Sequence, residues 1–406
     1  MVRSRVKAAG VAVINIKKWP VWAFAILYTL FGMSIPLMAA ILPEERVDVL
    51  YHRYSGDQVT VDGPSILASK NFGKHTSVYA GYYADSVTSA SIDVRTAASQ
   101  YTESRTEFNY GFNWLYDNAN ISLGYTNSEE HDYSSDTYHF GISQTMFGDL
   151  TTVSLGISYG DDTVRKNLRD ANGKFIGNDP LFGEKELKRR NYKLGVTQIL
   201  TKNLIMNFGF EAITDQGYMQ NPYRNAFIYS GSNVVSTQEE YPLARTSDAL
   251  ALRANYFLPY RASIHTEYKY YTDTWGVRSN TFKIGYVQPF LDQWTFDVSY
   301  RYYTQKQADF YKDVYAENED TLKYHGHDKE LSTYNSSSVG VKASYQFLQN
   351  SWWIIDKGSL NFSYERIVFN FDNFSSFSKQ TEDLANYGKP FQYDANVVQF
   401  FVSVWY

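Results

Sequence analysis

The chain has 406 residues, of which 17% are aromatic, and its mean hydropathy is −0.41. Aromatic residues interspersed with polar ones exclude a bundle of membrane-spanning helices, because each such helix needs about 20 mostly apolar residues. The formal net charge is −5 and cysteine is absent. The absence of cysteine excludes disulfides and thiolate metal sites. The negative charge argues against nucleic acid as a partner, because phosphate binding needs clustered Lys and Arg.

The first forty residues have the order of a secretory signal peptide. An apolar stretch over 19–42 follows five basic residues, which are Arg3, Arg5, Lys7, Lys17 and Lys18. Basic, then apolar, then small residues is the sequence of features that export signals share. We therefore predict a signal peptide over 1–40, cleaved near Ala39 or Ala40, and a mature protein over 41–406. The alternative is one anchor helix ahead of a soluble domain.

Beyond residue 58 the dominant pattern is a period of two. Phe108, Tyr110 and Phe112 share one parity, while Asn109 and Gly111 share the other. The same alternation occurs over 121–126, 138–143, 153–159, 204–211 and 339–347. Successive residues of a strand point to opposite faces, so each stretch predicts a strand with one apolar and one polar face.

The connections between these strands are of two kinds, and the two kinds alternate. Short turns are predicted at 72–74, 117–118, 147–149, 201–202, 258–260 and 290–292. Long polar segments are predicted at 88–104, 126–136, 161–188, 215–245, 303–334 and 372–392. Transmembrane barrels have short periplasmic turns and long extracellular loops, whereas a soluble sandwich has no reason to sort its loops. Aromatic residues beside the turns, such as Trp114 and Trp294, are typical of interfacial girdles.

These patterns predict an all-β protein, a single transmembrane antiparallel up-and-down β-barrel of about 16 strands. The count comes from seven hairpins between about 59 and 371, a first strand near Asp48–Tyr54 and the C-terminal strand. Fourteen strands is the alternative, because Asp62-Gly63-Pro64 interrupts an early strand and Pro is tolerated only at edges or bulges. The last strand, ending at Tyr406, resembles the signal that delivers barrels to the barrel assembly machinery. The predicted surroundings are outer-membrane lipid and lipopolysaccharide.

The polar parity of the strands carries the candidate site. Ten charged or titratable residues are predicted to line the lumen: Lys193, Glu211, Arg253, His265, Glu267, Lys269, Asp297, Arg301, Lys342 and Glu365. In a water-filled lumen these residues cost little, whereas in a soluble core each would need a partner. Glu267 with Lys269, and Asp297 with Arg301, predict either ion pairs between strands or a narrow point with a transverse field. Neither arrangement predicts strong ion selectivity.

One loop cluster could bind a metal. His325 and His327 are two residues apart and Asp328 follows, so two imidazoles and a carboxylate could hold a transition metal. The alternative is an acidic loop that is simply solvated. No nucleophile elbow or phosphate loop occurs, so we expect neither an enzyme nor a cofactor.

Two segments resemble an uncharacterised proteobacterial family. They are VTVDGPSILASKNFGKHTSVYAGYYADSVTSASIDV, at 59–93, and TNSEEHDYSSDTYHFGISQTMFGDLTTVSLGISYG, at 126–160. The resemblance implies an outer-membrane barrel with a domain of unknown function. It assigns no substrate and no catalytic residue.

The function expected from these features is a porin-like channel for small solutes, monomeric or trimeric. A plugged structural or adhesive barrel that presents its long loops outward is the second hypothesis. The third is a barrel-borne hydrolase with a Ser or Asp beside a His, such as His139 or His265, at the outer rim.

Overall fold

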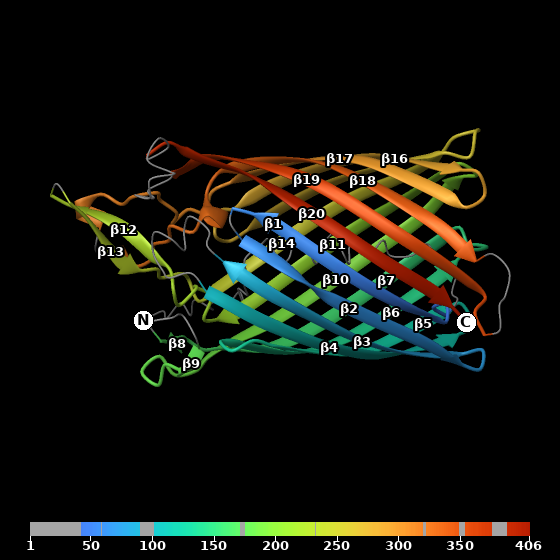
Figure 1. The fold of residues 1–406 in the computed structure, drawn as a ribbon, viewed down its shortest axis with the longest axis horizontal. Coiled ribbons are helices and arrows are strands. Elements are labelled where there is room, and N and C mark those ends of the chain that lie inside the picture. The colour runs from blue at the N-terminus through green and yellow to red at the C-terminus, as the bar shows by residue number, and fades with distance from the viewer. Residues whose placement is uncertain are drawn as a thin grey trace, which may run out of the picture.

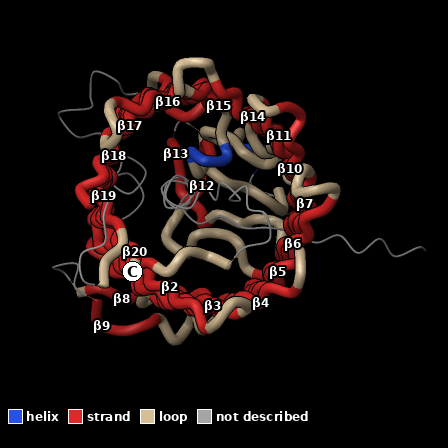
Figure 2. The backbone as a smooth tube through the Cα atoms, turned by 90° about the vertical axis from the view of Figure 1, so that its right-hand side faces the viewer, coloured by secondary structure: helices blue, strands red, loops and turns tan. Residues whose placement is uncertain are grey.

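Sixteen strands of the computed structural model form one closed antiparallel barrel, in which each strand pairs with its neighbours in chain order (Figures 1 and 2). The structure describes residues 42–57, 59–89, 101–170, 175–231, 233–319, 322–348, 354–375 and 388–406. The predicted all-β class and the count of 16 strands are confirmed, and the alternative of 14 is wrong. The predicted signal peptide lies outside the described residues.

The strands of the barrel are β1 (Arg46–Gly56), β2 (Val59–Phe72), β3 (Thr76–Ser89), β4 (Tyr101–Tyr116), β5 (Ala119–Glu129), β6 (Tyr133–Met146), β7 (Thr151–Val164), β10 (Lys185–Thr201), β11 (Leu204–Gly217), β14 (Ala244–Phe257), β15 (Ser263–Asp273), β16 (Arg278–Phe290), β17 (Trp294–Lys306), β18 (Tyr334–Leu348), β19 (Lys357–Ser375) and β20 (Pro390–Trp405). Two small hairpins lie in the connections: β8 (Asn167–Arg169) with β9 (Phe175–Asn178), and β12 (Asn225–Ser230) with β13 (Asn233–Gln238). Two 3-10 helices, η1 (Glu317–Glu319) and η2 (Lys329–Leu331), lie between β17 and β18. In the described part of the chain, no helix is long and apolar enough to cross a membrane.

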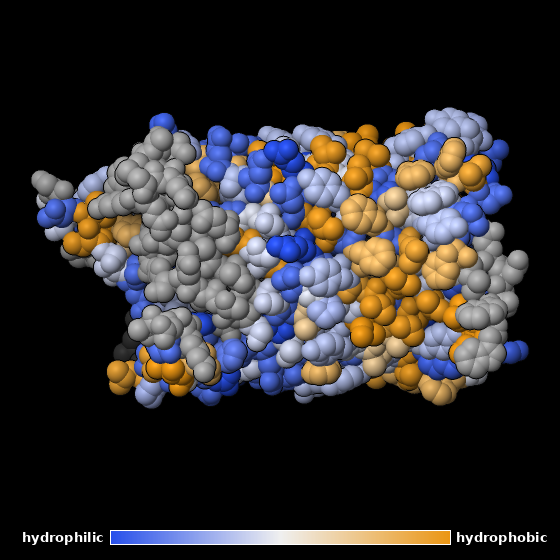
Figure 3. All heavy atoms as spheres, viewed as in Figure 1, coloured by the Kyte–Doolittle hydropathy of each residue, from blue (hydrophilic) through white to orange (hydrophobic). Residues whose placement is uncertain are grey.

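The period of two places apolar side chains on the outer face of the barrel. Leu123, Leu155 and Val298 are each more than half exposed, although they lie in the middle of strands. Figure 3 shows the apolar side chains gathered over the strands towards the end of the barrel that carries the short turns. The strand ends near the long loops are mostly hydrophilic on the same view. The barrel therefore has an apolar outer band and a wetter extension on the side of the long loops.

The seven predicted hairpins are present, and local backbone geometry explains their tightness. Phe147, Gly148 and Asp149 all have positive φ, at 57°, 63° and 65°. Asp117 has a φ of 50° in the turn between β4 and β5. Glycine and aspartate tolerate this left-handed region better than β-branched residues do, which places the turns at these positions.

The opposite end departs from the predicted pattern of long loops. The segment predicted at 126–136 is mostly strand, because β5 runs to Glu129 and β6 begins at Tyr133. Its polar residues pair across the two strands, as Asn127 does with Asp136 at 3.1 Å. The connections between β1 and β2 and between β15 and β16 are also short. Polar composition indicated loops here because these strand ends extend beyond the apolar band, where polar outer faces are favourable.

The predicted interruption at Asp62-Gly63-Pro64 is wrong, since β2 continues through it. A Cβ on Gly63 would lie 1.8 Å from the carbonyl oxygen of Ala84, so only glycine permits this approach between β2 and β3. Pro64 is paired with Tyr51 on β1 but has no register partner on β3. Proline lacks a backbone N–H donor. Strand pairing is therefore lost on only one side of β2 at this position and is kept on the other.

Pairing of β1 with β20 closes the barrel. The register runs from Arg46 opposite Trp405 to Gly56 opposite Ala395. The Tyr406 hydroxyl donates to the Ser69 carbonyl oxygen at 3.0 Å. The predicted first and last strands are both confirmed.

Candidate functional site: the barrel interior and its mouth

The structure places all ten predicted residues on the strand faces opposite the exposed apolar side chains. Lys193 on β10 and Glu211 on β11 face each other, with Nζ 3.5 Å from Oε1. Arg253 on β14 forms an ion pair with Glu267 on β15. These pairs join neighbouring strands. Charges close in sequence on one strand, such as Glu267 and Lys269, have other neighbours across the ladder.

The remaining predicted residues lie on the same inner face. Asp297 on β17 is in register with Lys342 on β18. Glu365 on β19 is opposite Gly340, and the His265 ring on β15 occupies the space beside Gly285, where a Cβ would lie 2.2 Å from the imidazole.

The exposure of a charged side chain in the middle of a strand shows that other side chains do not fill the barrel interior around every charge. The Lys193 side chain is 61% exposed, although its neighbour Tyr192 points to the outer face and is itself 43% exposed. A lysine with this exposure on the inner face requires unfilled space beside it. Water would fill such space, because a charged ammonium group is costly to desolvate even with a carboxylate 3.5 Å away.

Sequence reasoning missed Lys283 on β16. Lys283 lies between Phe282 and Ile284, which are 45% and 41% exposed on the outer face. Because successive residues of a strand point to opposite faces, this alternation could have placed Lys283 on the inner face. Its register partners are Arg301 on β17 and Glu267 on β15, and Glu267 forms its ion pair with Arg253. In the described residues, neither Lys283 nor Arg301 has a carboxylate within ion-pair distance. Two basic groups thus oppose each other on the inner wall, where like charges are unfavourable unless solvated.

Buried polar contacts between strands lie on the inner face nearer the long loops. Arg189 on β10 lies with its Nε 2.7 Å from Asp162 Oδ2 on β7, and Asp162 is fully buried. On the other side of the barrel, His52 on β1 is 2.7 Å from Asp85 Oδ1 on β3 and stacks on Tyr83. Arg189 and Asp162 are not register partners in the ladder between β7 and β10, and β1 is not paired with β3, so no local pattern predicted these contacts.

A mouth assembly, defined as residues 218–243 and 307–333, covers part of the long-loop end. β12 and β13 project beyond the strands in Figure 1, and they lie within the ring of strands when viewed along the barrel in Figure 2. The assembly has its own apolar core, which includes Met219, Tyr241, Tyr311, Leu331 and the adjoining Trp275. The Tyr241 and Trp275 rings are 5.6 Å apart, edge to face.

The mouth assembly contacts the rim at points far apart around the barrel. Lys329 Nζ is 2.5 Å from Asp57 Oδ2 in the connection between β1 and β2, and both side chains are almost fully buried. The Tyr311 hydroxyl donates to the Asn373 carbonyl oxygen on β19 at 2.9 Å. The Tyr223 hydroxyl donates to Asp132, between β5 and β6, at 2.8 Å. The assembly therefore links connections that belong to separate parts of the ring.

The three predicted metal ligands lie in this assembly but have separate partners. His325 Nε2 is 2.8 Å from the Gln238 carbonyl oxygen. His327 packs edge to face on Phe227, and Asp328 is 2.7 Å from Arg224 Nη1. In the described ranges, no three His, Cys, Asp or Glu residues are grouped so that they could hold a metal ion. The structure thus does not bring His325, His327 and Asp328 together as a ligand set, because backbone and cation contacts use them individually.

The histidines of the hydrolase hypothesis lie on the inner face at mid-strand. His139 on β6 is 3.0 Å from Ser158 Oγ through Nδ1 and 3.2 Å from Thr126 Oγ1 through Nε2. His265 is a register partner of Asn255 and Gly285. Both therefore lie within the barrel wall and not at the outer rim, where that hypothesis required them.

Glu239 is the buried acid at the centre of the mouth assembly. It is 1% exposed, and its Oε1 accepts from the His327 amide at 2.6 Å, while Oε2 accepts from the Tyr241 hydroxyl. Burial and the nearby Asp328 carboxylate raise the pKa of Glu239 to about 7, despite the opposing effect of Arg224. The other titratable groups that it influences are Tyr218, Tyr311 and Tyr315.

Packing of the mouth assembly should weaken as the pH rises. The folded assembly keeps the proton on Glu239 up to about pH 7, whereas an exposed glutamate loses it near pH ~4.3. The folded form thus binds more protons between these values, and its stability falls across that window as pH increases. Because the chain has no cysteine, a nitroxide at Val235→Cys can report the mobility of β13. We expect mobility to rise from pH 5 to pH 8.

Substitution Glu239→Gln should make that mobility independent of pH over the same range. Glu240→Gln is the matched control, because Glu240 is the adjacent residue and is exposed. An equal rise of mobility in the Glu239→Gln protein would show that another group controls the packing.

Comparison with known proteins identifies the family. No curated protein matches the sequence. A structure described as a bacterial polysaccharide outer membrane secretin is 8% identical, with 90% of this chain and 100% of that chain covered and a TM-score of 0.47. The CymD monoaromatic hydrocarbon channel is 8% identical, with 92% of each chain covered and a TM-score of 0.44. OmpT of Vibrio cholerae is 9% identical, with 90% and 100% covered and a TM-score of 0.42.

The predicted resemblance to an uncharacterised family is confirmed. The segment at 126–160 lies within the matched residues, whereas 59–93 lies outside them. A family described as "Protein of unknown function (DUF3570)" matches residues 96–355, which is more than half of the chain. The chain therefore belongs to the DUF3570 family.

Proposed function

We propose that this protein is an outer-membrane channel for small solutes, with a passage along the inner face of the barrel. The observation that carries the proposal is the 61% exposure of the Lys193 side chain at mid-strand. A 16-stranded barrel is wide enough for an aqueous channel unless it is plugged. The ten predicted residues, together with Lys283, would then line the passage and shape the field that a solute meets.

Single-channel recording in a planar bilayer tests this function. The full chain, refolded in detergent and shown to be folded by its heat-modifiable migration on gels, should produce conductance steps of reproducible size. A folded protein whose current equals that of a protein-free bilayer would contradict the proposal.

A plugged barrel that presents its loops is the second candidate, and the mouth assembly favours it. Its buried core and its contacts with Asp57, Asp132 and Asn373 make it a structured covering of the rim. Protease treatment of intact cells discriminates between the candidates. An adhesive barrel should lose binding and keep its solute uptake unchanged, whereas a channel should show altered uptake.

The same proposal assigns the partners of the protein. Residues 1–40 would direct export and be removed near Ala39 or Ala40. The apolar outer band would contact membrane lipid, and the outward strand ends would contact lipopolysaccharide. The last strand, which ends at Tyr406, would be the segment presented to the barrel assembly machinery.

A further inference from the structure

The hairpin of β12 and β13 has one occupied edge and one free edge. At the edge of β12, the Tyr229 amide donates to the Tyr315 carbonyl oxygen at 2.9 Å, and the Tyr315 amide donates to the Phe227 carbonyl oxygen at 2.8 Å. Among the described strands, β13 pairs with β12 alone. Val234 and Val235 of β13 point to opposite faces of the hairpin, and they are 50% and 49% exposed. β13 is therefore an edge strand that the described part of the chain leaves uncovered.

The bonds of β12 show which backbone groups of β13 point to its free edge. In an antiparallel pair, the amide and the carbonyl of one residue point to the same side, and successive residues alternate. The residues on either side of Ile228 use these groups for Tyr315, so Ile228 itself bonds to β13, where its register partner is Val235. Val235 hence points to β12. The amides and carbonyls of Val234 and Ser236 therefore point away from β12.

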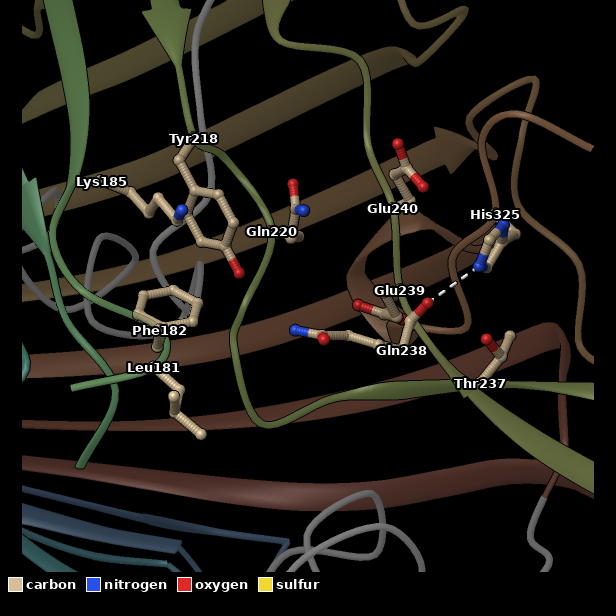
Figure 4. Close-up of a pocket in the computed structure, with 10 residues that line it drawn as sticks. All are labelled: Leu181, Phe182, Lys185, Tyr218, Gln220, Thr237, Gln238, Glu239, Glu240 and His325. Carbon is tan, nitrogen blue, oxygen red and sulfur yellow. Dashed lines mark hydrogen bonds between the residues drawn. The ribbon is translucent and has the colours of Figure 1, made fainter. Parts of the chain in front are cut away.

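Contacts at the base of the hairpin agree with this alternation. The carbonyl oxygen of Gln238, two residues beyond Ser236, is 2.8 Å from Nε2 of His325, as Figure 4 shows. The amide and the carbonyl of Glu240 pair with the backbone of His325. The mouth assembly thus occupies this edge at Gln238 and Glu240. In the described residues, the outward amides and carbonyls of Val234 and Ser236 have no hydrogen-bond partner.

The spacing of these outward groups fits a second copy of the same strand. An antiparallel copy that places Val234 opposite Ser236 also places Ser236 opposite Val234. One two-fold axis at Val235 therefore satisfies the outward amides and carbonyls of both copies, which is an isologous contact. Exposed strand edges are sites at which other chains add, and this addition would join the two hairpins into one continuous sheet.

The composition of the hairpin favours this partner. The segment 225–238, NAFIYSGSNVVSTQ, has no charged residue, so two copies meet without repulsion between like charges. Edge strands commonly carry lysine or proline, which prevent such pairing, and β13 has neither. In an antiparallel contact the two hairpins point in opposite directions. Because β12 and β13 project beyond the barrel strands (Figure 1), this direction suits two copies in facing membranes.

We infer that the free edge of β13 binds the same edge of a second copy of this chain, through Val234 and Ser236, between facing membranes. The inference goes beyond channel function and supplies a partner for the adhesive candidate. Only its placement between membranes rests on the proposed outer-membrane orientation. So short a contact is weak for one pair of molecules, but many copies on two membranes bind together.

Disulfide cross-linking tests the contact, because the chain has no cysteine of its own. In the inferred register Val235 lies opposite its own copy as a non-hydrogen-bonded pair, with a Cα separation of about 4.5 Å that a disulfide can span. Val234→Cys is the matched control, since Val234 has nearly the same exposure. Its own copy is offset by two residues, about 7 Å along the strand, and is out of reach.

The full chain is refolded in detergent micelles and treated with a mild oxidant. We expect Val235→Cys to form dimers at least roughly tenfold faster than Val234→Cys. A mixture of Val234→Cys with Ser236→Cys should also form dimers rapidly, because these positions lie opposite each other, whereas each of these variants alone should react slowly. Heat-modifiable migration confirms that each variant is folded.

A second substitution tests the outward backbone groups. Ser236→Pro removes an outward amide without loss of a hydrogen bond to β12, so it should abolish the rapid dimers of Val235→Cys. Ser236→Ala keeps that amide and should leave these dimers unchanged. Vesicles that carry the unmodified chain should cluster, measured by light scattering, whereas vesicles with Ser236→Pro should stay dispersed.

Equal rates for Val235→Cys and Val234→Cys, a slow mixture, or rapid dimers that survive Ser236→Pro would each overturn the inference and leave the edge to a strand of another protein. Dispersed vesicles of the unmodified chain would overturn the arrangement in facing membranes. Failure of the channel function is distinct, because cross-linking in micelles measures no ion flow and bilayer recording needs no second membrane.

Discussion

Reversing the charges of Lys283 and Arg301 together is expected to turn a channel that favours anions into one that favours cations. Both lie on the inner face, in register with each other, and neither forms an ion pair with a carboxylate in the described residues, although Glu267 is also in register with Lys283. The same wall, formed by β14 to β18, also carries Arg245, Arg253, Lys269 and Lys342 against Glu267, Asp273 and Asp297. Basic groups thus outnumber acidic ones along this part of the passage.

The expected change is large because four units of charge are altered. One unit charge contributes about 1 kcal/mol at 4 Å in water, and a change of about 1.4 kcal/mol corresponds to tenfold. We therefore expect the anion-to-cation permeability ratio of Lys283→Glu with Arg301→Glu to fall at least roughly tenfold. Reversal potentials measured across a KCl gradient give this ratio directly.

Exchange of a paired charge provides the control for this experiment. Arg253→Glu with Glu267→Arg inverts an existing ion pair and leaves the net charge of the wall unchanged. Its permeability ratio should stay close to that of the unmodified protein. Equal ratios in the unmodified protein and in the Lys283 and Arg301 double variant would show that ions do not pass this wall.

Substitution Lys329→Met is expected to increase the single-channel conductance. Lys329 and Asp57 form an ion pair in which the side chains are only 5% and 6% exposed. Removal of one partner leaves a buried charge uncompensated, which typically costs about 3–5 kcal/mol. The mouth assembly would relieve this cost by detaching from the connection between β1 and β2. The opening beneath it would then widen, and the steps in a bilayer recording would become larger.

Two further variants separate detachment from a general loss of stability. Lys312→Met breaks a more exposed pair with Glu319 in the same assembly, so it should leave the conductance unchanged. Asp57→Asn combined with Lys329→Met removes both charges, and this should return the conductance towards its original value. Unchanged steps in the Lys329→Met channel would mean that the mouth assembly does not limit the current.

The barrel itself could be predicted because membrane strands have a strict period. Alternation such as Phe108 to Tyr116 fixes which face is apolar, and the tight turns fix where each hairpin reverses. The predicted ends of the strands on the long-loop side were wrong. There, polar residues such as Asn127 and Asp136 stay in the ladder, so composition alone cannot distinguish a strand above the membrane from a loop.

The candidate site was only partly predictable, for a different reason. Parity placed Lys193 and Glu211 on one face without identifying them as partners, and the same rule would have found Lys283. The mouth assembly, in contrast, depends on contacts such as Lys329 with Asp57, which are distant in sequence and follow no period. The role of Glu239 depends on burial among residues from two separate connections, which no local pattern encodes.

Closure by pairing β1 with β20 has a consequence for how this protein forms. Every other strand pairing of the barrel joins two barrel strands that follow each other along the chain, so it can form while the chain is still partly assembled. The seam between residues 46–56 and 395–405 can form only last, across nearly the full length of the chain. Until then two unpaired edges persist, and unpaired edges are the sites at which other chains add. We therefore expect closure of this seam to be both a slow step of biogenesis and the one most exposed to aggregation.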